Sequence, residues 1–338
     1  MAAFCLQLAA CATGGGLAPD PASGAASGST TSGMAVAGTV TSLSGLTVNG
    51  YQIDLPRGVV FSRNGDTASA ADLRIGQVVE AEASGEGRRL TAQRIAIRHE
   101  VVGPLERIDR AGGKLVVLGQ RVTLASGPEG PGDSLGNIAP GAIVEVSGLR
   151  RLDGSITATR VDRAAPGSPV FVRGPVTAAD ANGFSIAGLR IDAPAATRPP
   201  TVQQGREAAI RGVAEGSRFR ATLVQGAPPV PYEGRVRRIS AEGFLGKTLG
   251  GALAVGTIPL TRPAPDARVR PGDRVIVEGT LDPRGRIVPD SAVPAGGGAA
   301  TSGTWTGETD ARSPLQTLPA REPMGTDRLP DSYRRYLR

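Results

Sequence analysis

The chain has 338 residues, of which 40% are hydrophobic but only 3% aromatic, and its formal net charge is +7. This length accommodates two or three ordinary domains or several small ones, and its cores must be built from valine, isoleucine, leucine and alanine. Both cysteines, Cys5 and Cys11, precede residue 12, which excludes disulfides and cysteine-based metal sites from the rest of the chain. No run of 18 apolar residues occurs, so we expect no membrane-spanning helix.

The basic charge comes almost entirely from arginine, because lysine occurs only at Lys114 and Lys247. An excess of positive charge is typical of proteins that bind nucleic acid or an anionic surface. The alternative is the amino-acid usage of a GC-rich genome. The arginines are scattered and lie mostly beside turns, which favours the second interpretation.

The first residues end in Leu8-Ala9-Ala10-Cys11, the pattern of a bacterial lipobox, and residues 12–33 are rich in glycine, alanine, serine and threonine. This segment resembles a lipoprotein precursor. The resemblance implies that residues 1–11 are a signal remnant, that Cys11 is lipidated, that residues 12–33 are a flexible tether, and that Ala12 directs the protein to the periplasmic side of the outer membrane. The apolar stretch is short and contains Gln7. The alternative is a chance match and a cytoplasmic location.

Two sequence landmarks recur four times along the chain. The first is an apolar run followed by a glycine and, shortly after it, by another apolar residue. The glycines of its four copies are Gly50, Gly119, Gly188 and Gly256. The second is a glycine followed by an alternating strand: Gly76, Gly141, Gly205 and Gly272. Successive copies of each landmark are separated by nearly the same number of residues, so we predict four repeats, at 34–99, 100–168, 169–232 and 233–295. We predict that residues 296–338, which follow them, are a disordered basic tail.

Each repeat shows the pattern of short antiparallel strands. We assign the first strands to Gly38-Thr-Val40, Gly103-Pro-Leu105, Gly174-Pro-Val176 and Gly234-Arg-Val236, and turns to residues 85–87, 153–154, 182–183 and 283–285. Residues 66–75 predict a short helix or 3₁₀ turn capped by Asp66 or Thr67. Five or six strands in about 65 residues suit a small closed barrel. The predicted fold is therefore all-β, with four tandem small OB-like antiparallel β-barrels between a disordered N-terminal tether and a disordered C-terminal tail.

The repeat pattern, with its Gly-x-Val start, its Gly-x-x-Ile turn and its Asp-Gly hairpin, resembles the DUF5666 repeats of bacterial exported proteins and lipoproteins. The first two copies fit best, through Gly76–Ala83 with Ala92 and through Gly141–Gly148 with Ala158. The resemblance implies tandem OB-like barrels and an envelope location. It implies no activity, because the function of that family is unknown.

Three short motifs suggest chemistry, but their surroundings argue against it. Gly132-Asp-Ser-Leu-Gly136 fits a serine-hydrolase pattern, yet the one histidine, His99, lies at a repeat boundary, and we predict a turn. Gly246-Lys-Thr248 resembles the end of a P-loop, but Ala241 replaces the first glycine. We predict His99 to be a solvated linker residue. We therefore predict no enzyme, no catalytic residue, no metal, no cofactor, and no pocket with converging polar groups.

Three arginine pairs are the best candidates for ligand binding. If the barrels stack in register, two of the pairs could form a basic stripe for phosphates or anionic glycans, and the alternative is ordinary solvated turns. We therefore predict a non-enzymatic cell-envelope lipoprotein that binds or organises an anionic envelope polymer or a protein partner. The alternative, a cytoplasmic OB-like nucleic-acid-binding protein, lacks stacking aromatics. The six candidates are Arg88, Arg89, Arg150, Arg151, Arg237 and Arg238.

Overall fold

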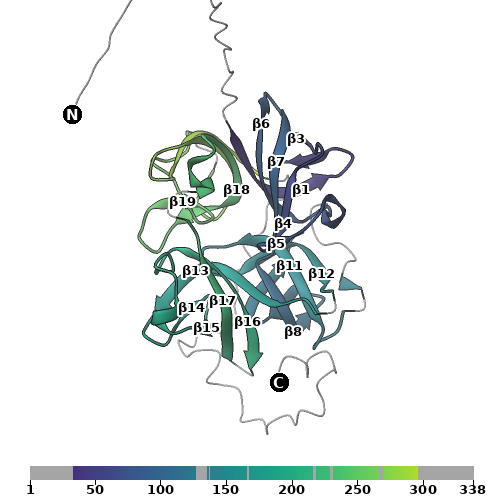
Figure 1. The fold of residues 1–338 in the computed structure, drawn as a ribbon, viewed down its shortest axis with the longest axis vertical. Coiled ribbons are helices and arrows are strands. Elements are labelled where there is room, and N and C mark those ends of the chain that lie inside the picture. The colour runs from purple at the N-terminus through teal and green to yellow at the C-terminus, as the bar shows by residue number, and fades with distance from the viewer. Residues whose placement is uncertain are drawn as a thin grey trace, which may run out of the picture. The chain divides into compact units, whose positions relative to one another are not determined.

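The structure of the chain, a computed structural model, describes residues 33–126, 135–136, 138–165, 167–215, 218–228, 231–265 and 269–295 (Figure 1). These residues form β-strands joined by short turns and a few 3₁₀ turns, so the predicted all-β fold is confirmed. Cys11, all of the predicted tether but Gly33, and the predicted tail lie outside the described residues.

The first barrel is closed by five strands: β1 (Met34–Ser42), β2 (Leu46–Val48), β3 (Tyr51–Asp54), β6 (Val78–Glu86) and β7 (Arg89–Arg98). Strand β1 pairs with β2, β2 with β3, β3 in parallel with β7, β7 with β6, and β6 again with β1. This closed five-stranded order is OB-like. Between β3 and β6 lie β4 (Val60–Arg63), β5 (Asp66–Thr67) and the 3₁₀ turn η1 (Ala70–Asp72).

The other three barrels repeat the same pairing order. In the fourth barrel a parallel bridge between Leu260 and Ile287 closes the third strand onto the fifth. The second barrel contains β8 (Val101–Asp109), β9 (Lys114–Val117), β10 (Gln120–Leu124), β11 (Ile143–Arg150) and β12 (Ile156–Arg163). The third contains β13 (Val170–Ala179), β14 (Gly183–Ile186), β15 (Leu189–Asp192), η3 (Ala195–Thr197), β16 (Glu207–Glu215) and β17 (Arg218–Gly226). The fourth contains η4 (Pro231–Gly234), β18 (Arg238–Lys247), β19 (Leu253–Val255), β20 (Ile258–Pro259), β21 (Arg274–Leu281) and β22 (Ile287–Pro294).

The two glycine landmarks are positions where the backbone must take a positive φ. In the first three repeats the turn between the second and third strands has two consecutive positive-φ residues, as in a type I′ hairpin, and these are Asn49-Gly50, Leu118-Gly119 and Ala187-Gly188. The glycine before the fourth strand has φ between +82° and +95° in all four repeats. Because only glycine reaches such angles without strain, the repeat pattern records backbone requirements.

Replacing Gly272 with alanine is expected to lower the free energy of unfolding by about 1–3 kcal/mol, because a Cβ is strained at its φ of +95°. Nothing lies within 4 Å of the added carbon, so the effect reports the backbone and not a clash. Urea denaturation measures it. Gly250→Ala is the matched control, because Gly250 has no positive φ and should change by a few tenths of a kcal/mol. Equal effects of the Gly272→Ala and Gly250→Ala substitutions would contradict the conclusion that the positive φ of Gly272 requires glycine.

The first strand of the fourth repeat was assigned wrongly from the sequence. Strand β18 places Gly243 opposite Val275, as β1 places Gly38 opposite Val79, whereas Gly234 lies in η4. Gly243 is required because the following hairpin turn folds back over it, and a Cβ there would lie 2.9 Å from the Gly256 backbone nitrogen.

Two local expectations are corrected in detail. The predicted 3₁₀ turn exists as η1, but Ser69 caps it: its backbone N–H and hydroxyl both donate to Asp72, at 2.8 and 2.9 Å. The turn predicted at residues 182–183 is present, but unlike an ordinary Asn-Gly hairpin turn it has no positive φ. Instead, the Asp180 carboxylate accepts both backbone N–H groups, so a side chain provides the geometry.

The barrels are joined in two pairs through their first strands. Strand β1 pairs in parallel with β18, which links the first barrel to the last, and β8 pairs with β13, which links the second to the third. The result is one sheet of 12 strands and one of 10 strands. Val78, Leu149 and Phe244, from the first, second and fourth barrels, form one buried cluster. The repeats therefore surround a common centre.

Candidate functional site

A cavity of ≈ 310 Å³ lies where the four barrels meet. Every barrel contributes to its wall, so the prediction that no polar pocket is shared between repeats is wrong. The physical reason is the pairing of β1 with β18, which joins the first barrel directly to the last. Lining residues include Gly38 and Val78 from the first barrel, Leu149 and Leu152 from the second, Pro175 and Thr177 from the third, and Thr248, Val255 and Ile258 from the fourth.

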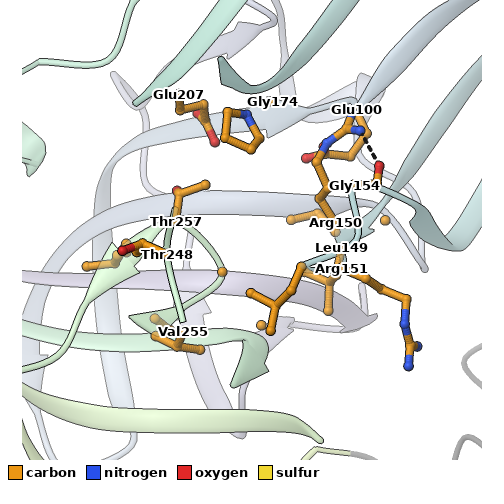
Figure 2. A pocket seen from close by; sticks show the side chains of 18 of the residues that line it. Glu100, Leu149, Arg150, Arg151, Gly154, Gly174, Glu207, Thr248, Val255 and Thr257 are labelled. Carbon is orange, nitrogen blue, oxygen red and sulfur yellow. Dashed lines mark hydrogen bonds and ion pairs between the residues drawn. The ribbon is translucent and has the colours of Figure 1, made fainter. Parts of the chain in front are cut away.

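Side chains from the second and fourth barrels face each other across this cavity. Figure 2 shows Leu149 and Arg150 on one side, and Thr248, Val255 and Thr257 on the other. Leu149 and Arg150 end strand β11, and Thr248 follows β18 directly. A mostly apolar wall with a few converging polar groups is typical of small-molecule sites.

The first and third barrels contribute a cluster of charged residues. Arg98 makes ion pairs with Glu80 and with Glu207, the latter at 2.7 Å, and Arg173 approaches Glu207 at 3.4 Å. Burial acts against the charge of Glu207, but Arg98 and Arg173 outweigh it and lower the pKa of this carboxyl. Burial, together with the neighbouring Arg98, lowers the pKa of Arg173 to about 10. Glu207 is therefore ionised and Arg173 protonated at neutral pH.

Arg150 holds three segments together at the cavity wall. Its side chain is 6% exposed, and its Nε donates to Glu100 at 3.0 Å. Its Nη1 donates to the Gln120 side chain and to the Gly154 carbonyl, and its Nη2 donates to the Arg173 carbonyl. The dashed line in Figure 2 marks the contact with Gly154. Arg150 therefore ties the second barrel to the third and to the linker residue Glu100.

A fourth carboxylate of the cavity is held between the first and last barrels. Glu242 accepts a hydrogen bond from the Thr39 backbone N–H at 2.7 Å and from Arg274 Nε at 2.6 Å. Each glutamate that lines the cavity (Glu80, Glu100, Glu207 and Glu242) is thus paired with an arginine.

The rim of the cavity combines exposed apolar groups with a free cation. Leu152 and Leu249 are 48% and 61% exposed, and both line the cavity. Lys247, at the end of β18, is exposed and also lines it. In the described part of the chain the side chain of Lys247 makes no hydrogen bond or ion pair, which distinguishes it from the other charged lining residues.

The arginine pairs do not form one continuous surface. Arg88 stacks over Tyr51 at 4.4 Å and pairs with Glu278 of the fourth barrel at 2.6 Å. Arg238 lies near the same tyrosine and, like Arg88, opposes the rise in the Tyr51 pKa that burial and Glu278 cause. Arg89 and Arg237 are exposed.

The pair Arg150–Arg151 lies elsewhere, at the cavity. Arg151 stacks over Phe244 at 4.3 Å, and Arg150 is buried and fully engaged. Arg150 is therefore not available to an anionic polymer. Ligand binding by the other five arginines stays a prediction.

His99 is buried, so its assignment as a solvated linker residue is wrong. It is 1% exposed, its Nδ1 lies 3.0 Å from the Asn64 side-chain nitrogen, and its Nε2 lies 3.6 Å from Glu145. Burial, helped by the charges of Arg63 and Arg173, lowers the pKa of His99 to about 3. Burial raises the pKa of Glu145. His99 is thus a neutral residue at the joint between the first two barrels.

The remaining motifs gain no catalytic surroundings. Most of Gly132–Gly136 lies outside the described residues. Gly246 and Lys247 end β18, whose partner is the antiparallel strand β19, so no P-loop frame surrounds them. Among the described residues, no three histidine, cysteine, aspartate or glutamate side chains are close enough to share a metal ion.

Sequence reasoning missed the buried role of Arg150, although the repeats contain a signal. A register shift at the same place in all four barrels aligns the copies. In that alignment Arg150 corresponds to Gly85, Ala214 and Leu281. A charged residue at a position that is otherwise small or apolar marks a local departure from the repeat.

Comparison with known proteins identifies two of the repeats. Residues 37–96 and 102–162 match the family model described as a domain of unknown function, DUF5666. The matches cover the two repeats that the sequence pattern fits best. No curated protein and no solved structure matches the chain. In the described part of the chain, no helix has the length and apolar character that crossing a bilayer requires.

Proposed function

Residues 37–96 and 102–162 of this chain are two DUF5666 domains in tandem, and we propose that the protein is a non-enzymatic binding protein of the cell envelope. The observation that carries the proposal is the cavity of ≈ 310 Å³, whose wall needs all four barrels. Four barrels that each contribute to one pocket serve as a scaffold for a ligand. The geometry favours a small molecule over the anionic polymer suggested by the arginine pairs.

The state of the charged groups supports binding rather than catalysis. A general acid or base must be able to exchange a proton with the substrate. Glu80, Glu100, Glu207 and Glu242 are each paired with an arginine, which fixes the orientation of their carboxyl groups within the protein. His99 is buried against Asn64 and Glu145.

The aromatic residues argue against the nucleic-acid alternative. Single-stranded nucleic acids bind OB-like barrels by stacking their bases on exposed aromatic rings. Within the described ranges the aromatic side chains are buried or half-buried, with Phe171, Phe184, Phe219 and Phe244 among the most buried residues. The barrels therefore offer no stacking platform in the described region.

The lipobox pattern around Cys11 supports the proposed envelope location. We expect cells fed a radioactive fatty acid to label the wild-type protein and to leave Cys11→Ser unlabelled. Cys5→Ser is the matched control and should remain labelled. An unlabelled wild type, or label that survives Cys11→Ser, would contradict the anchor and leave the cytoplasmic alternative.

The binding function has a separate test. Native mass spectrometry of the full chain, purified from its own membranes, is expected to show a small-molecule adduct of any chemical class. Thr257→Trp should remove the adduct, because Thr257 lies at the cavity (Figure 2) and a tryptophan there fills it. Thr301→Trp, in the predicted tail, should retain it. An adduct-free wild type, or an adduct that survives Thr257→Trp, would overturn the proposed function.

A further inference from the structure

We infer that the ligand of the shared cavity is a small amphipathic anion, with a chain of about ten carbons and one carboxylate or comparable acidic headgroup. This inference rests on the proposed function and names the ligand class. It is carried by three features of the cavity: its size, its apolar rim, and one unpaired cation.

The interior charges do not select a charged ligand, because they neutralise one another. Arg98 pairs with Glu80 and Glu207, and Arg150 pairs with Glu100. Inserting a ligand charge among them would break ion pairs that are already partly removed from water, which is costly. A ligand that fits this cavity therefore keeps its charge away from the interior pairs.

Lys247 provides the place for that charge. It is at the rim, it is exposed, and its side chain has no hydrogen bond or ion pair in the described part of the chain. Its ammonium group can donate to an acidic headgroup while both remain partly hydrated. An exposed ion pair of this kind changes binding by up to about fivefold.

The apolar surface next to Lys247 provides the place for the chain. Leu152 and Leu249 are exposed at the rim, and Val255 and Ile258 continue the apolar wall from the fourth barrel. Covering these side chains removes apolar surface from water, and each additional methylene group that is buried tightens binding about fourfold. Leu152 and Leu249 are thus the reason for placing the apolar chain of the ligand beside Lys247.

The volume sets the length of the chain. A dry cavity of about 150 Å³ accommodates benzene, with six heavy atoms. The present cavity of ≈ 310 Å³ is twice as large, so it accommodates about twelve heavy atoms. Decanoate has this number and one carboxylate.

The test is isothermal titration calorimetry with decanoate, using the full chain as Cys11→Ser so that no attached acyl chain competes. We expect binding of one decanoate per chain, and hexanoate to bind at least a hundredfold more weakly. Decylammonium, with the same number of carbons and the opposite charge, should bind at least tenfold more weakly than decanoate. Equal binding of decanoate and decylammonium would overturn the inferred anionic headgroup.

Substitutions then locate the two halves of the ligand. Lys247→Gln should weaken the binding of decanoate about fivefold and leave the binding of decanol unchanged. Lys247→Arg, which keeps the positive charge, should bind decanoate as the wild type does. Arg57→Gln removes an exposed cation elsewhere and should have no effect on either ligand. Leu249→Asp should weaken both ligands at least tenfold, whereas Leu43→Asp, at a leucine of 43% exposure, should not. No change in Lys247→Gln would reject the headgroup site.

The two proposals fail in different ways. If a cavity-dependent adduct is found by mass spectrometry but decanoate does not bind, or binds without Lys247, the ligand class is wrong and the binding function stands. If no adduct depends on the cavity, the proposed function itself is wrong.

Discussion

Replacing Arg150 with methionine is expected to lower the free energy of unfolding by about 3–5 kcal/mol. The side chain is 6% exposed and contacts Glu100, Gln120 and the carbonyls of Gly154 and Arg173. Methionine replaces the aliphatic part of the arginine side chain but carries no charge and no hydrogen-bond donor, so Glu100 would remain buried without its partner. Urea denaturation followed by circular dichroism measures the loss.

Arg89→Met is the matched control for this substitution, because Arg89 is exposed. We expect it to change the free energy of unfolding by less than about 0.5 kcal/mol. The double variant Glu100→Gln with Arg150→Met should be more stable than the sum of the two single effects implies, because neither charge is left unpaired. Additive effects would show that the two residues do not act as a pair.

Lowering the pH from 7 to 5 is expected to reduce the free energy of unfolding by about 2 kcal/mol through His99. The pKa of this histidine is about 3 in the folded protein, below its ordinary value of 6.5. The unfolded chain therefore takes up a proton as the pH falls through 6.5, whereas the folded protein does not. The contribution of the neutral His99 to the free energy of unfolding is complete above pH 6.5 and is lost progressively as the pH falls towards 3.

The control for this prediction must take account of the charged groups around the His99 ring. Arg63 and Arg173 disfavour the protonated ring, while the raised pKa of Glu145 acts in the opposite direction by favouring the folded state in acid. His99→Gln keeps an acceptor for Asn64 and removes the titration, so its stability should be flatter between pH 7 and 5. Because His99 is the one histidine of the chain, the difference between the two profiles isolates it. Parallel profiles would contradict a neutral, buried histidine.

Much of each barrel could be predicted because its landmarks are local. A glycine with positive φ, as at Gly50 or Gly141, is required by the turn itself, so it recurs wherever the turn recurs. The error at Gly234 was avoidable for the same reason. The first-strand glycine precedes the turn glycine by similar distances in repeats one to three, and Gly243, not Gly234, keeps such a distance to Gly256.

The cavity and the surroundings of His99 could not be predicted from the sequence, because both are formed by segments that lie far apart in the chain. Asn64, in the turn between β4 and β5, reaches His99 from 35 positions away. Arg98 meets Glu207 across 109 positions. A repeat pattern describes what the copies share, whereas the interfaces depend on residues that only one copy has.

The pairing of β1 with β18 has a consequence for how the protein is made. Thr39 and Glu242, which meet at this interface, are 203 positions apart, so the first barrel leaves the ribosome long before its partner strand exists. Until then one edge of β1 exposes backbone groups that can pair with another chain. In a linear repeat array each unit contacts only its neighbours, whereas here the last barrel covers an edge of the first, so a chain that ends early in the fourth barrel would retain this open edge and would aggregate.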